Sequence, residues 1–186
     1  MRIFLTAVLL IAAAACAGKP STNYHDPSMD FASLRTIAVM PFANLTREKL
    51  AGERVRDTFF SNLMSTGAVY VIPSGELARG ISRLGIVDPA EPSSEEIAKL
   101  ATVIKADAFI TGVVREYGEV RSGSTSANVI SLSMQMIDAQ SRKVVWTAAS
   151  TKGGIGMKDR LLGGGGQPMN EVTEAAVNDI INKLFQ

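Results

Sequence analysis

Few side chains in this sequence are suited to nucleophilic or metal-dependent catalysis. Among its 186 residues there is one cysteine, Cys16, and one histidine, His25. A serine or cysteine nucleophile needs a base such as histidine beside it, and common zinc sites need several histidine or cysteine ligands. His25 lies in a short polar segment that offers it no such partners. We therefore expect no catalytic or metal-binding role for His25, and no cofactor.

Carboxylates are the remaining candidates for acid–base chemistry. Four acidic residues fall near the ends of predicted strands: Asp107, Glu116, Glu119 and Asp138. Two carboxylates held in different environments can act as general acid and general base. Acidic residues at strand ends more commonly face solvent or cap turns, so we expect a protein that is not an enzyme.

Residues 1–15 have the features of a secretory signal peptide. Arg2 gives a positive start, residues 3–11 are almost wholly apolar, and residues 12–15 are all alanine. The apolar run is shorter than the ~20 residues of a membrane-spanning helix. An ordinary signal peptide that happens to contain a cysteine is one interpretation.

The other interpretation is a lipoprotein signal, because Ala13, Ala14 and Ala15 directly before Cys16 resemble a bacterial lipobox. This resemblance implies that the Cys16 thiol is linked to diacylglycerol and becomes an acylated, palmitate-bearing N-terminus. Ala17, rather than aspartate, follows Cys16. By analogy with enteric sorting, we expect anchoring to the outer membrane with the domain in the periplasm.

The charge balance argues against nucleic acid as a partner. The chain has 19 Lys and Arg and 18 Asp and Glu; removal of Arg2 with the signal leaves 18 of each, and a net charge of zero. Nucleic-acid binders present a basic patch or stripe, and no run of Lys and Arg occurs here.

The remaining pattern predicts a lipidated flexible tether over residues 16–33 and one α/β domain over residues 34–186. The tether is expected because the segment is rich in Gly, Pro, Ser and Asn. The predicted strands cover residues 37–40, 68–72, 106–117, 129–138 and 143–151. The predicted helices cover residues 49–66, 74–84, 93–104 and 170–185.

These elements give the order β-α-β-α-α-β-β-β-α, which predicts a mixed sheet of about five strands flanked by helices. A strand, a crossover helix and a strand imply that the first two strands are parallel. The clean alternation of residues 129–138, followed by a polar turn, predicts an antiparallel hairpin with residues 143–151. Residues 118–126 are expected to form a polar loop.

Residues 153–167 include seven glycines and are expected to form a flexible loop. A phosphate loop is a poor alternative, because no Gly-Lys-Ser/Thr follows the glycines. Leu161 and Leu162 are awkward in a solvated loop, and exposed apolar side chains mark interaction surfaces. We therefore predict a partner-binding loop that uses Gly153, Gly154, Met157, Leu161 and Leu162.

The chain resembles the CsgG-type, TolB-N-terminal-like superfamily of bacterial envelope lipoproteins. The residues that carry the resemblance are Ile37–Thr46, Ala51–Leu63, Ala106–Val114 and Ile137–Trp146. The resemblance implies a periplasmic α/β domain that works by protein–protein contact, as in the curli secretion pore and the LpoB-type activators. A curli-type pore needs two long inserted hairpins, which residues 118–126 and 153–167 do not supply, so we expect no transmembrane barrel.

These observations lead to three hypotheses. The first is a non-enzymatic, outer-membrane-anchored adaptor that binds envelope machinery proteins. The second is a ring-forming structural component of a secretion or flagellar-type apparatus, which would self-associate. The third is a small-molecule or glycan-binding module, which would need a pocket that the pattern does not reveal.

Overall fold

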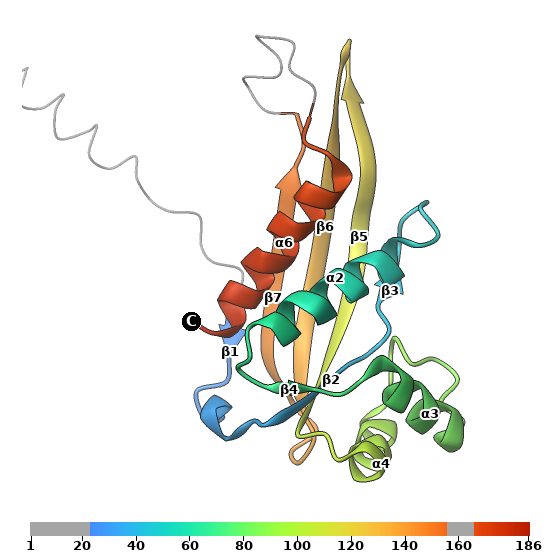
Figure 1. The fold of residues 1–186 in the computed structure, drawn as a ribbon, viewed down its shortest axis with the longest axis vertical. Helices are drawn as coiled ribbons and strands as arrows, with labels where there is room; N and C mark the ends of the chain where they lie inside the picture. The colour runs from blue at the N-terminus through green and yellow to red at the C-terminus, as the bar shows by residue number, and fades with distance from the viewer. Residues whose placement is uncertain (1–22, 156–165) are drawn as a thin grey trace, which may run out of the picture.

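The computed structural model describes residues 23–155 and 166–186, which form one mixed sheet with helices on both faces (Figure 1). The strands are β1 (Asn23–His25), β2 (Thr36–Val39), β3 (Ala43–Asn44), β4 (Tyr70–Val71), β5 (Ala108–Ser122), β6 (Thr125–Asp138) and β7 (Val144–Gly153). The helices are the 3₁₀ turn η2 (Phe31–Ser33), α2 (Ala51–Ser65), α3 (Ser74–Leu84), α4 (Ser94–Ile104) and α6 (Met169–Leu184).

The sheet order is β1-β7-β6-β5-β2-β4, and β3 adds to the same edge of β5 as β2. The predicted α/β class is confirmed, and β2 and β4 are parallel as the crossover through α2 requires. The sheet has seven strands rather than about five. The additional strands, β1 and β3, have three and two residues, too few for alternation to be recognised in the sequence.

Two apolar cores lie on opposite faces of this sheet. The larger one packs α2 and α6 against the sheet and includes Phe59, Trp146 and Ile180, each fully buried. The smaller one packs α3 and α4 against the other face, with Leu77, Leu100 and Phe109 at its centre. Adjacent strand residues point to opposite faces, so Ala38 and Phe109 join one core while Val39 and Ile110 join the other.

The helix ends follow the predicted signals closely. Ser93 Oγ accepts from the Glu96 backbone N–H at 3.3 Å, and Glu96 Oε2 accepts from the Ser93 N–H at 2.7 Å, which completes a capping box. These hydrogen bonds from Ser93 lower the pKa of Glu96. Gly85 ends α3 with a φ of 65°. The predicted N-cap Ser74 is instead the first residue of α3, after Pro73.

The prediction of a polar loop over residues 118–126 is wrong. The β5–β6 ladder continues to the pair Ser122–Thr125, with a turn at Gly123 and Ser124. Most of residues 119–126 are exposed. A strand with no buried face does not need apolar residues, so its sequence resembles that of a loop.

The prediction of a flexible tether does not hold for residues 23–33. β1 pairs antiparallel with β7 through His25 and Trp146, and Met29 and Phe31 pack on the larger core. Residues 16–22 lie outside the described part of the chain. Among residues 23–155 and 166–186, none of the helices is both long and apolar enough to cross a membrane.

Candidate interaction surface

Two of the acidic residues considered for catalysis, Asp107 and Asp138, bind backbone N–H groups and so serve local structure. Asp107 Oδ2 accepts from the backbone N–H groups of Arg35 and Thr36 at 2.9 and 2.8 Å. Asp138 Oδ2 accepts from the Ser141 N–H in the β6–β7 turn at 2.6 Å. Within the described residues, no group of three or more His, Cys, Asp or Glu side chains could hold a metal ion.

His25 packs into an aromatic cluster. Its ring meets those of Phe31 and Trp146 edge-on, with ring centroids 5.3 and 6.4 Å apart. Its Nε2 lies 3.5 Å from the carbonyl oxygen of Leu184 at the end of α6. The ring therefore joins β1 to the last turn of α6.

The glycine-rich segment is held at both ends by one residue of β6, Asn128. The Gly154 N–H donates to the Asn128 carbonyl oxygen at 2.8 Å. The Asn128 side chain, through Nδ2, donates to the Gln167 carbonyl oxygen at 2.9 Å. Gly154 and Gln167 are thus held beside the same point of the sheet.

Glycine is required at the two contacts that bring the segment against β6. Gly153 has a φ of 79°, and a Cβ there would clash with the Asn128 carbonyl oxygen. A Cβ on Gly166 would lie 2.7 Å from the Cα and from the Cβ of Ala127. Glycine therefore allows a close backbone approach at both ends.

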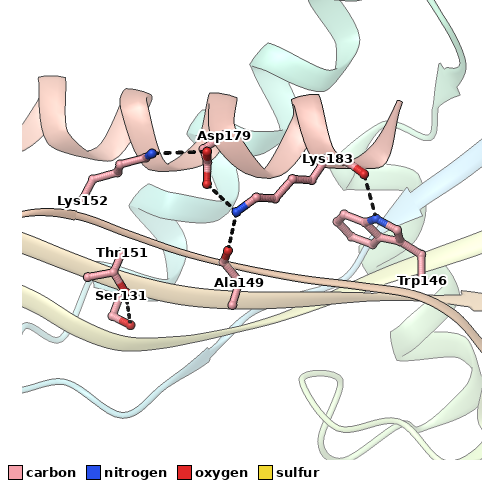
Figure 2. A network of polar contacts seen from close by, with 7 residues as sticks. All are labelled: Ser131, Trp146, Ala149, Thr151, Lys152, Asp179 and Lys183. Carbon is pink, nitrogen blue, oxygen red and sulfur yellow. Dashed lines mark hydrogen bonds and ion pairs between the residues drawn. The ribbon is translucent and has the colours of Figure 1, made fainter. Parts of the chain in front are cut away.

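A polar network fixes α6 on β7 (Figure 2), and it begins at Lys152, the residue before Gly153. Asp179 binds Lys152 of β7 at 3.2 Å and Lys183 of α6 at 2.8 Å. Lys183 Nζ also donates to the Ala149 carbonyl oxygen at 2.8 Å, and Trp146 Nε1 donates to the Lys183 carbonyl oxygen at 3.2 Å. Burial raises the pKa of Asp179, but hydrogen bonds from Lys183 and Lys152 outweigh it and hold that pKa below its ordinary value.

The β5–β6 hairpin projects beyond the rest of the domain at the same end (Figure 1). β7 pairs with β6 as far as Val129. On the other side, among the described residues, the last backbone hydrogen bond to β5 joins the Leu45 N–H to the Val114 carbonyl oxygen. Near the tip, Arg121 binds Glu119 at 2.8 Å; hydrogen bonds from Ser126 and Arg121 lower the pKa of Glu119. The tip is therefore a polar, well-paired ribbon beside the ends of the glycine-rich segment.

A second polar surface lies on the sheet face opposite α6. One row crosses four strands, from Tyr24 of β1 through Thr147 and Gln135 to Thr111 of β5. It borders a shallow hollow of about 600 Å³ that also includes Arg115. Hydroxyl and amide groups beside an exposed tyrosine suit a neutral polar ligand, so this hollow is the place where the ligand-binding hypothesis would apply.

The predicted site residues fall into two groups. Gly153 and Gly154 are described, and they form the first end of the segment held by Asn128. Cys16, Met157, Leu161 and Leu162 lie outside the described residues. The role of Asn128 was missed, because nothing in the local pattern marks an asparagine that binds a backbone carbonyl 39 residues away.

Comparisons with known proteins point to lipoproteins. A family model of GNA1162-like lipoproteins matches residues 27–186 of this chain. A search of the curated proteins finds no match.

Three solved structures share the fold. A PelC dodecamer from Paraburkholderia phytofirmans is 16% identical, with a TM-score of 0.58, and the match covers 89% of this chain and 98% of that chain. Lipoprotein GNA1162 from Neisseria meningitidis is 20% identical, with a TM-score of 0.56 and coverage of 80% and 99%. The hypothetical protein CT253 from Chlamydia trachomatis is 14% identical, with a TM-score of 0.52 and coverage of 82% and 96%.

Proposed function

This chain belongs to the GNA1162-like family of lipoproteins, and from that premise we propose that it is an outer-membrane-anchored, periplasmic adaptor without enzymatic activity. In this proposal Cys16 carries the lipid, and the folded domain binds a protein of the envelope machinery. The wider kinship with CsgG-type and TolB-N-terminal-like envelope proteins is part of the same proposal. It is supported by the sequence motifs of β2, α2, β5 and the β6–β7 hairpin.

The observation that carries the adaptor role is the attachment of the glycine-rich segment to Asn128. Both ends of the segment are fixed to the same residue, beside a projecting hairpin and next to the ion pairs that hold α6. Recognition segments are commonly displayed in this way, from a rigid scaffold. The sequence of this segment supplies apolar side chains, Met157, Leu161 and Leu162, which favour contact with a protein partner.

To test this, the acylated, full-length protein is cross-linked in its own membranes and then purified in mild detergent. Proteins that are recovered with it are its candidate partners. We expect a discrete envelope protein to be recovered. Replacing Met157, Leu161 and Leu162 together with serine should abolish recovery while the circular dichroism spectrum and the unfolding midpoint stay unchanged. A matched control replaces the exposed residues Leu45, Met64 and Val87 with serine.

Two outcomes would contradict the proposal. Equal recovery of the partner by the segment variant and by the control variant would show that the segment is not part of the interface. A Cys16→Ala protein that still incorporates palmitate, or that still fractionates with the outer membrane, would remove the proposed lipid anchor.

A second candidate function is a ring-forming structural component, and the unpaired edges of the sheet favour it. Among the described strands, β1 and β4 each pair on one side only, so two different edges are available for head-to-tail contacts. Heterologous contacts of this kind close into rings, and PelC, which shares this fold, forms a dodecamer. The mass of the same detergent-purified protein tests it. A discrete multiple of the protomer supports a ring, and a single protomer excludes it.

A further inference from the structure

The first strand of the domain lies very close in sequence to the proposed lipid. Six residues, 17–22, lie between Cys16 and Asn23, the first residue of β1, so seven Cα–Cα steps connect the two. At no more than ~3.6 Å per residue, this connection spans at most about 25 Å. A domain anchored through Cys16 therefore keeps β1 near the bilayer surface.

The surface around β1 carries an apolar groove. Met29 and Phe31 form one side of it, and Leu184 and Phe185 at the end of α6 form the other, around a hollow of about 620 Å³. Phe185 is 48% exposed, while Met29 and Phe31 are partly exposed. β1 and the end of α6 lie side by side (Figure 1), joined by the contact between His25 and Leu184.

The rim of the groove carries little net charge. Asp26 accepts hydrogen bonds from the backbone N–H and the hydroxyl of Ser28, at 2.9 and 2.7 Å. Lys143 lies near enough to favour the charged form of Asp26. A contact made here would depend on apolar side chains rather than on attraction to anionic headgroups, so it should be insensitive to salt.

The groove also lies far from the hairpin tip. His25 pairs with Trp146, and Trp146 pairs with Met136 of β6. Thr125 at the tip is eleven residues from Met136 along the same strand, or about 36 Å at ~3.3 Å per residue. If the groove faces the bilayer, the hairpin tip and the two described ends of the glycine-rich segment lie away from it.

We propose that the groove formed by Met29, Phe31, Leu184 and Phe185 docks on the lipid bilayer, at the boundary between headgroups and acyl chains. The short connection to Cys16 holds the groove against the membrane, and the docked domain points its partner-binding end into the periplasm. Apolar and aromatic side chains are the groups that favour this boundary. The inference rests on the proposed lipidation of Cys16.

The experiment uses the full-length lipoprotein in vesicles of phosphatidylethanolamine and phosphatidylglycerol. Ala32→Cys places a thiol for an environment-sensitive fluorophore at the groove, and Ala68→Cys places one beside β4 at the opposite edge; both alanines are exposed. The lipid blocks Cys16, so only the new thiol reacts. We expect the fluorophore at position 32 to shift to the blue and to be quenched by brominated acyl chains, and the one at position 68 to respond to neither.

Phe185→Ser in the Ala32→Cys protein should reduce the ratio of docked to undocked protein roughly five- to tenfold. About half of the Phe185 surface is exposed and available to the membrane, and the substitution removes that apolar surface from the contact. Tyr70→Ser, which removes another exposed aromatic residue far from the groove, should leave the ratio unchanged. Raising the salt concentration should leave the quenching unchanged as well.

Four outcomes would overturn the proposal. Equal responses at positions 32 and 68 would show that the groove lies no closer to lipid than the opposite edge of the sheet does. A blue shift at position 32 without quenching would show that protein covers the groove, such as a second copy of the chain. The intact mass of the same sample separates this inference from the proposed function. A mass without diacylglycerol overturns both, whereas a lipidated protein with an aqueous fluorophore at position 32 overturns the docking alone.

Discussion

Asn128 and Gly153 fix the two described ends of the glycine-rich segment against β6. The Asn128 carbonyl accepts from Gly154, and its amide group holds Gln167. Gly153 must lie against that carbonyl with a positive φ, which a residue with a Cβ adopts at a cost. The two described ends of the segment are therefore held through their backbone atoms.

The first prediction compares Gly153→Ala with Gly154→Ala. Both glycines have positive φ values, 79° and 88°, so each substitution should cost about 1–2 kcal/mol of stability. A Cβ at Gly153 also meets the Asn128 carbonyl and lies 2.9 Å from Val172, whereas a Cβ at Gly154 has no neighbour within 4 Å among the described residues. Urea unfolding should therefore show a loss of more than about 3 kcal/mol for Gly153→Ala. Equal midpoints for the two variants would contradict this reading.

The second prediction concerns Asp179 and acid stability. The pKa of Asp179 in the folded protein lies below its ordinary value. The ionised carboxylate therefore stabilises the fold above the pKa of the unfolded chain, ~3.9, and this contribution is lost as the pH falls through the lower, folded pKa. Asp179→Asn should cost roughly 1 kcal/mol at neutral pH and flatten the stability profile below about pH 4.

The control for this measurement is Asp57→Asn. The Asp57 side chain is 77% exposed, and its ion pair with Arg56 is long, at 4.0 Å. Asp57→Asn should therefore leave the dependence of stability on pH unchanged. Thermal unfolding between neutral pH and pH 3 gives both profiles, and parallel curves for Asp179→Asn and the unmodified protein would refute the role of the α6–β7 network.

At the scale of elements, the β5–β6 hairpin combines two functions in one ribbon. Its lower half is the centre of the sheet, where Ile110, Leu132 and Met134 are buried. Its upper half, beyond Tyr117 and Val129, projects past the last pairs with the neighbouring strands. The buried half fixes the register, because a one-residue shift would turn its apolar side chains away from the core.

The third prediction is that the tip can be shortened without loss of stability. Deleting the pairs Arg121–Ser126 and Ser122–Thr125 keeps the turn at Gly123 and Ser124 and preserves the register, since two residues leave each strand. The free energy of unfolding should change by less than about 1 kcal/mol, because the deleted residues contribute nothing to either core.

The same deletion should weaken cross-linking to the envelope partner, because the tip lies beside the ends of the glycine-rich segment. Serine at both Arg79 and Arg83, two exposed residues of α3, is the control and should leave cross-linking unchanged. Undiminished cross-linking of the shortened protein to the partner would show that the tip is not part of the proposed interface.

At the scale of the whole molecule, the two apolar cores differ in size and in the helices that they hold against the sheet. The larger core joins α2 and α6 to five of the strands and surrounds Trp146. The smaller core holds α3 and α4 on the opposite face. Segments with less buried apolar surface open at lower free energy, so the α3–α4 layer should open independently of the rest.

The fourth prediction tests this independence with Gly80→Leu. A Cβ at Gly80 would lie 2.8 Å from Ile104 and 2.9 Å from Leu100, so the larger side chain separates α3 from α4. The expected cost is about 1–3 kcal/mol. Hydrogen exchange should show lost protection in α3 and α4 while β6 keeps its protection. Gly75→Leu, where the nearest atom is 3.7 Å away on a flexible arginine, serves as the control; uniform loss of protection would show a single cooperative unit.

The sequence by itself determined most of the architecture of this protein. Periodic apolar residues and capping signals are local properties. They made four features predictable: the parallel pairing of β2 and β4, the β6–β7 hairpin, the capping box of α4 and the amphipathic helix α6. The same local patterns implied the α/β class and the lipoprotein character that the family match supports.

Only the tertiary structure decided what depends on distant contacts. β1 has no alternation to recognise and exists because the edge of β7 is open to it. The hairpin tip has no buried face, so its composition indicated a loop where pairing continued from the core below. Asn128 acts on a residue 39 positions away, and the groove beside β1 is shared by the two ends of the described chain. In each case the physical cause is a contact between segments far apart in sequence, which no local pattern records.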